Sequence, residues 1–132
     1  MTDVFLNERE ETIQRRGPYL SFSRINRYLL CPFQYWLYYI ENLRPKILSA
    51  GLAFGKLVHE ALAIFLQNKE DPVKFFQMIW GEANQADLDY NKKESWEKLN
   101  ASGQGLLEKF VKEEFPKLGS ISGVEKPFEM NI

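Results

Sequence analysis

The chain of 132 residues contains one histidine, His59, within the stretch AFGKLVHEAL. An imidazole can bind a divalent metal ion or transfer a proton near neutral pH. On a helical wheel, His59 falls between the apolar stripe and the charged strip of its helix, over Gly55 one turn earlier. That glycine costs the helix up to about 1 kcal/mol relative to alanine and leaves room beside the ring. We therefore expect a partly sheltered imidazole.

Two interpretations of this histidine stay open on periodicity alone. The functional one is a metal ligand or proton-transfer group with space beside it. The structural interpretation is a boundary histidine that hydrogen-bonds a neighbouring carbonyl, with Gly55 serving close helix packing.

The residues expected to form the core stripe of this helix are Phe54, Leu57, Val58, Ala61, Leu62 and Phe65.

Hydrophobic spacing predicts a mainly α-helical chain of four to five helices. Residues 1–18 are polar, end in Gly17-Pro18 and predict a flexible N-terminal arm. Pro32 should end one short helix near Leu30 and start the next, because proline breaks a helix interior but suits its first turn. Asp71-Pro72 predicts another helix start. The remaining helices are expected over residues 50–67, 72–83 and 92–115.

From Val124 to Ile132, apolar and polar residues alternate, which predicts a terminal β-strand. A lone strand has no partner for its ladder hydrogen bonds. We therefore expect either a partner chain that pairs this strand or a longer parent protein of which this is the N-terminal part, and we favour the second.

The bulk composition narrows the class of protein. One cysteine, Cys31, allows no internal disulfide and fits a reducing cytoplasm. No run of about 18 apolar residues and no signal peptide are apparent, so we expect no membrane span. Residues 12–59 hold seven basic residues and one acid, a net of +6 in a chain of net charge −1. This asymmetry indicates either a surface that faces a polyanion or simply a solvated face.

Two ordered segments, LSFSRINRYLLCPFQYWLYYIENLRP and LAFGKLVHEALAIFL, resemble the N-terminal half of RecB-like PD-(D/E)XK nucleases. The resemblance covers about residues 19–66 well, and the later Glu125-Lys126-Pro127-Phe128 looks like the start of that family's central sheet. It implies that residues 19–132 are the helical N-terminal portion of an α/β restriction-endonuclease-like domain, truncated before the catalytic sheet. The matching positions are Ser21, Ser23, Cys31, Pro32, Tyr35, Gly55, Val58, His59 and Leu62.

In that family the residue matching His59 binds the catalytic Mg²⁺ or Mn²⁺, together with an Asp and an (Asp/Glu)-x-Lys pair from the sheet. Such an ion prefers oxygen donors and polarises the scissile phosphate. This chain lacks those partners. The resemblance therefore implies a DNA exonuclease parent, in DNA repair, recombination, phage replication or CRISPR-associated processing, whose fragment is inactive alone.

Two further residues carry open alternatives. Glu125 is a candidate metal ligand or outer-shell residue, although a charged residue on an open strand face is more often solvated. Cys31 matches the position at which a subset of these nucleases binds a [4Fe–4S] cluster, but its three partner cysteines are absent here. It could bind a cluster only in a full-length parent, and a lone cysteine is most often a small buried hydrophobe.

Basic and aromatic residues supply the candidate DNA contacts. Arg24 and Arg27 lie three residues apart on one helix face, and Arg44 and Lys46 flank a proline. We expect single-stranded or end-containing DNA as the partner. Residues 33–39 could stack on bases, although crowded helical aromatics are more often core. The alternative function is a non-catalytic helical module that binds nucleic acid or protein.

Overall fold

The structure is a computed structural model that describes residues 19–130. The chain divides into two compact units, one ending at Lys46 and the other beginning at Ile47. We call them the N-terminal unit and the helical unit and describe each by itself. The expected flexible arm, residues 1–18, lies outside the described residues, as do Asn131 and Ile132.

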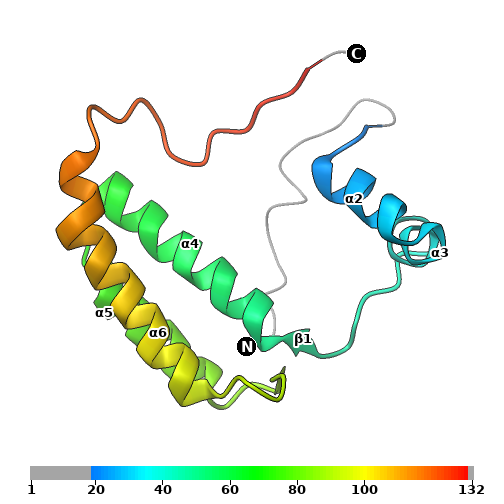
Figure 1. The fold of residues 1–132 in the computed structure, drawn as a ribbon, viewed down its shortest axis with the longest axis horizontal. Coiled ribbons are helices and arrows are strands. Elements are labelled where there is room, and N and C mark those ends of the chain that lie inside the picture. The colour runs from blue at the N-terminus through cyan, green and yellow to red at the C-terminus, as the bar shows by residue number, and fades with distance from the viewer. Residues whose placement is uncertain (1–18, 131–132) are drawn as a thin grey trace. The chain divides into compact units, whose positions relative to one another are not determined.

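The N-terminal unit contains α2 (Phe22–Leu30), α3 (Pro32–Tyr35) and the π-helical turn η1 (Trp36–Ile40), and Figure 1 labels α2 and α3. The Ser21 hydroxyl caps α2 by accepting a hydrogen bond from the backbone N–H of Arg24 at 3.3 Å. Cys31 is extended, and Pro32 opens α3. The predicted break at Pro32 is therefore confirmed.

The helical unit begins with β1 (Leu48–Ser49) and α4 (Ala50–Asn68). Asp71 caps the next helix by accepting from the backbone N–H groups of residues 73 and 74, as its position before Pro72 predicted. Ser95 caps α6, which thus starts four residues later than predicted. The remaining elements are α5 (Pro72–Ala83), β2 (Leu88–Asp89), α6 (Trp96–Lys109), η2 (Phe110–Glu114) and η3 (Phe115–Lys117).

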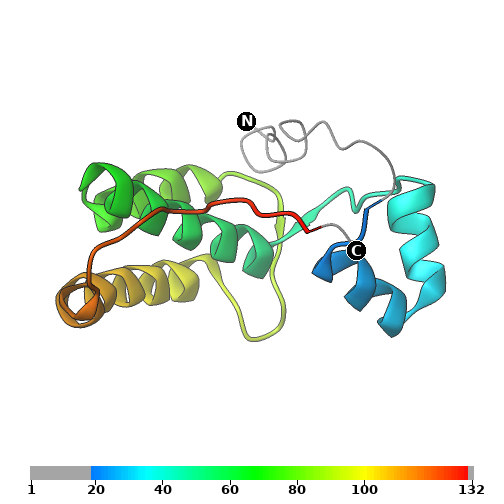
Figure 2. The same ribbon diagram turned by 90° about the horizontal axis from the view of Figure 1, so that it is seen from above.

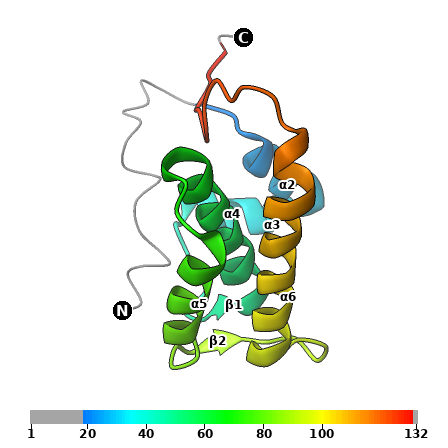
Figure 3. The same cartoon turned by 90° about the vertical axis from the view of Figure 1, so that its left-hand side faces the viewer.

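A two-stranded parallel sheet, not a terminal strand, is the β-structure of the described residues. Leu48 pairs with Leu88 at one end of the helices, as Figure 3 shows. The strand predicted from Val124 is wrong, because residues 124–130 form none. Phe128 and Met130 are 90% and 76% exposed, so the alternating pattern buries nothing, and no neighbouring strand satisfies its backbone. The mainly helical class itself is confirmed.

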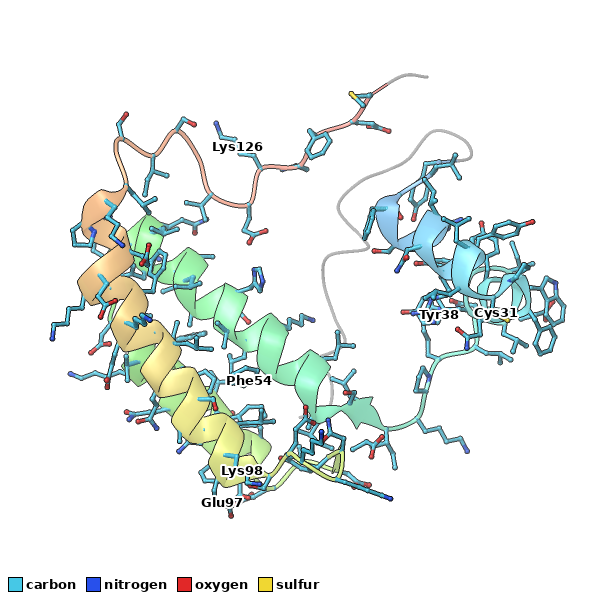
Figure 4. All side chains as sticks on the ribbon, viewed as in Figure 1. Cys31, Tyr38, Phe54, Glu97, Lys98 and Lys126 are labelled. Atoms are coloured by element: carbon cyan, nitrogen blue, oxygen red, sulfur yellow. The ribbon has the colours of Figure 1, made fainter. Side chains whose placement is uncertain are left out.

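The core of the helical unit lies between α4, α5 and α6, which run side by side in Figure 3. Phe54, labelled in Figure 4, makes edge-to-face contacts with Phe76 and Trp80 at about 6 Å. Trp80 Nε1–H donates to the carbonyl of Trp96 at 3.1 Å, and Trp96 Nε1–H donates to the carbonyl of Trp80 at 2.8 Å. These reciprocal bonds join α5 to α6 and satisfy both indoles.

The apolar stripe predicted for α4 faces this core. Leu57, Ala61 and Phe65 are buried, and the other three predicted members are half-buried. By length and composition α4 could cross a membrane, with a mean hydropathy of 1.2 over its 18-residue window. A core helix packed against neighbours has the same properties, and α4 packs against α5 and α6.

At Gly103, α6 lies directly against the Phe76 ring of α5. A Cβ added there would lie 2.2 Å from Cζ of Phe76, a ring with no exposed surface in which to move. We predict that Gly103→Ala lowers the free energy of unfolding by about 1–3 kcal/mol, measured by urea denaturation. Gly105→Ala on the same helix is the control, because its added Cβ would have no atom within 4 Å apart from the adjacent residues and the backbone of its own helix. It should be neutral or stabilising by up to about 1 kcal/mol. Equal effects would contradict the predicted close packing.

Candidate functional site

His59 lies in the middle of α4, and its side chain is 76% exposed. The expected partial shelter is therefore wrong. The helical wheel correctly placed His59 outside the apolar stripe of α4. The helices α5 and α6 pack on the face of α4 that carries Leu57 and Ala61. Among the described helices of the helical unit, none covers the face that carries His59, and the ring reaches solvent.

The polar neighbour of the imidazole is Glu125, whose Oε1 lies 3.8 Å from Nδ1 of His59. After η3 the chain passes over the C-terminal half of α4 as far as Glu125, as Figure 2 shows from above, and then leads away from that helix in Figure 1. The chain bends at Val124 and Glu125, where Glu125 has a φ of 50°, a left-handed conformation uncommon outside glycine. The glutamate side chain is 41% exposed. A contact between residues 66 positions apart thus brings together two residues that the sequence had singled out.

Gly55 does not serve close helix packing. Apart from the adjacent residues and the backbone of its own helix, no atom lies within 4 Å of a Cβ built at this position. This finding contradicts the structural interpretation of His59 in one respect, namely that Gly55 serves close helix packing. The space next to the imidazole is open, as the sequence predicted.

The His59–Glu125 pair offers one nitrogen and one carboxylate as metal donors. Among residues 19–130, no group of three or more His, Cys, Asp or Glu side chains lies close enough to hold a metal ion. The two exposed groups also contribute little to stability as an ion pair, because water and salt screen them. The described residues thus bring together two donors, and a complete metal site needs further ones.

The predicted DNA contact Arg24 is enclosed by aromatic rings. Its Cζ lies 4.4 Å from the ring centroid of Tyr19 and 4.6 Å from that of Tyr39, and Nη1 donates to the hydroxyl of Tyr35 at 3.4 Å. Burial lowers the pKa of Arg24, but hydrogen bonds to Tyr19 and Tyr35 outweigh it and raise the pKa above its ordinary value. The guanidinium is therefore a permanent cation that holds three tyrosines together.

The other predicted contacts, Arg27, Arg44 and Lys46, lie in the same unit. The guanidinium carbons of Arg27 and Arg44 lie 4.0 Å and 3.6 Å from the ring centroid of Tyr38. Arg44 Nη1 also donates to the backbone carbonyl of Tyr38. Lys46 is exposed. The sequence predicted these cations as DNA contacts but did not identify an individual role for Tyr38. Residues 27, 38 and 44 come together only in the folded unit.

The aromatic residues 33–39 do not form a closed core. None of residues 19–46 is fully buried, and Phe33 and Trp36 are 63% and 43% exposed, with their rings 6.0 Å apart and inclined by 16°. The interpretation of most of these residues as core is wrong. Two short helices enclose too little volume to bury so many rings.

Cys31 is a free, half-buried thiol at the N-cap of α3, next to the π-helical turn (Figure 4). Its side chain makes no capping hydrogen bond. Cys31 is therefore only partly buried, between the small buried hydrophobe that a lone cysteine most often is and an exposed thiol. Its role as an iron–sulfur ligand in a longer parent stays a prediction.

Comparison with known proteins gives the class of this chain. The model of the PD-(D/E)XK nuclease superfamily matches residues 19–130, so the chain belongs to that superfamily. A domain of this superfamily is a nuclease domain, with nucleic acid as its substrate, and its members generally use divalent metal ions such as Mg²⁺. No curated protein and no solved structure matches the chain.

We predict that His59→Ala leaves the free energy of unfolding within about 0.5 kcal/mol of the unsubstituted protein, measured by thermal or urea denaturation. The ring is largely exposed, and exposed substitutions away from caps and cores have small effects. A loss of more than about 1 kcal/mol would mean that the imidazole is packed in solution. If its stability is unchanged, the His59→Ala variant can also be used to test function separately from folding.

Proposed function

We propose that this chain is the helical portion of a RecB-like, metal-dependent DNA exonuclease, with His59 as a ligand of Mg²⁺ or Mn²⁺ and Glu125 as a ligand or orienting residue. The observation that carries the proposal is the 3.8 Å separation of His59 Nδ1 and Glu125 Oε1 on an open face of α4. The RecB-like resemblance of residues 19–66 supports the choice within the superfamily.

The geometry of the pair fits one shared ion. Two donors that each lie about 2.1 Å from one cation are at most about 4.2 Å apart, so a 3.8 Å separation needs only a small adjustment. The segment before Glu125 borders a cavity of about 600 Å³, lined mainly by residues 115–124, with Leu66, Gln67 and Lys69 on α4 and its cap. The Glu125 side chain is 41% exposed, so a rotation of this side chain can supply the required fraction of an ångström.

Each residue has a defined task in this proposal. His59 holds the ion from a rigid helix, and Glu125 holds it, or orients the imidazole, from an adjustable segment. The ion, when bound, polarises the phosphate that is cleaved. The Asp and (Asp/Glu)-x-Lys residues that the resemblance implies come from outside the described residues, and the DNA contacts are Arg24, Arg27, Arg44 and Lys46. The biological setting is DNA repair, recombination or related DNA processing.

A second candidate is a non-catalytic helical module that binds nucleic acid. The arginine–tyrosine contacts of the N-terminal unit favour it, because they require no metal. The two candidate functions differ in whether Mn²⁺ should bind at His59.

The metal site can be tested by nuclear magnetic resonance, because one histidine in the chain makes its imidazole C–H signals unambiguous. We predict that substoichiometric Mn²⁺ broadens these signals selectively. Glu125→Gln should raise the Mn²⁺ concentration needed by roughly tenfold, because an outer-shell or direct partner of a ligand contributes about that much affinity.

Glu129→Gln is the matched control, since Glu129 is an exposed glutamate on the same segment. It should behave like the unsubstituted chain. Imidazole signals that broaden no more than those of other exposed residues would reject the metal site and leave the non-catalytic module. Equal effects of the two glutamate substitutions would remove Glu125 from the site.

A further inference from the structure

Tyr38 holds two guanidinium groups in one small region of the N-terminal unit. Arg27 comes from α2 and Arg44 from the segment after η1, and both Cζ atoms lie within 4.0 Å of the same ring centroid. Their Cζ atoms are therefore at most 7.6 Å apart. Figure 4 labels Tyr38, which lies on η1.

This arrangement is held in place from several sides. Arg44 donates to the carbonyl of Tyr38, which fixes its guanidinium near the end of η1. The Tyr38 ring packs edge-to-face on Tyr39 at 4.8 Å, and Tyr39 in turn contacts Arg24. A guanidinium carries five N–H donors, so the bond to one carbonyl leaves donors for an anion.

The charges around Tyr38 favour an anionic ligand. Glu41 is the one acid in residues 19–46, against Arg24, Arg27, Arg44 and Lys46. Neither Arg27 nor Arg44 makes an ion pair with an acid of the described residues. Two cations at this separation repel each other, and an anionic ligand that contacts both guanidinium groups offsets that repulsion. Arginine pairs bind phosphate through charge-assisted hydrogen bonds.

We infer that Arg27 and Arg44 bind backbone phosphate of single-stranded DNA and that Tyr38 is the positioning residue that presents them. The inference rests on the proposed nuclease function and names the substrate form for it. Single strands are favoured because Phe33 and Trp36 expose nearly parallel rings, on which unpaired bases can stack. Tyr38 itself acts through its ring, which attracts both cations.

The experiment measures binding of a fluorescein-labelled oligothymidylate to the full 132-residue chain by anisotropy, with EDTA present and over a range of salt. Tyr38→Leu should weaken binding about tenfold, the loss of one charge-assisted contact, whereas Tyr38→Phe keeps the ring and should retain affinity. Arg27→Gln and Arg44→Gln should each reduce the slope of log affinity against log salt by about 0.7.

Tyr28→Leu is the matched control, because Tyr28 is an exposed tyrosine of α2 whose ring contacts Tyr35 and, among the described residues, no arginine. Its affinity should stay unchanged. Circular dichroism establishes that each variant keeps its helices; if Tyr38→Leu unfolds, the arginine variants and Tyr38→Phe still decide. Free inorganic phosphate should compete only at far higher concentration than the oligonucleotide.

Three results would overturn the inference: Tyr38→Leu binding as tightly as the control, arginine variants with an unchanged salt slope, or equal competition by inorganic phosphate. Equal affinity for a duplex of the same length would overturn the single-strand assignment. Since EDTA removes any metal, these failures are distinguishable from failure of the Mn²⁺ site at His59.

Discussion

The packing of α4 against α5 and α6 determines where the single imidazole can act. Buried Leu57, Phe76, Trp80 and Leu107 fix one face of α4 inward, and the opposite face is thereby turned to solvent. The reciprocal bonds of Trp80 and Trp96 and the contact of Gly103 with Phe76 hold the other two helices in place. The backbone of His59 is held in place by this packed helix, although its own side chain touches little.

The candidate site therefore combines one fixed donor and one adjustable donor. His59 comes from the middle of a packed helix, and Glu125 comes from a segment that forms no regular structure. At 3.8 Å and with high exposure, the pair has little value as an ion pair in water. A shared divalent cation would give both groups a stronger partner than they offer each other. This is the physical reason to interpret the contact as half of a metal site.

The sequence predicted the parts of the fold that depend on local signals. Proline at residue 32 and the Asp71-Pro72 pair marked helix starts correctly, because capping and proline sterics act over a few residues. The strand from Val124 failed, because a strand needs a neighbour that alternation cannot supply. The exposure of His59 and the two-arginine contact on Tyr38 were also missed. Both depend on which elements cover a given face, and a helical wheel carries no such information.

The metal assignment at His59 can be tested most directly with crystals of the chain soaked in Mn²⁺ and measured at a wavelength where manganese scatters anomalously. A peak within bonding distance of both Nδ1 of His59 and Oε1 of Glu125 is the expected result. Density that shows the imidazole without an ion, or manganese bound only at other carboxylates, would contradict the account.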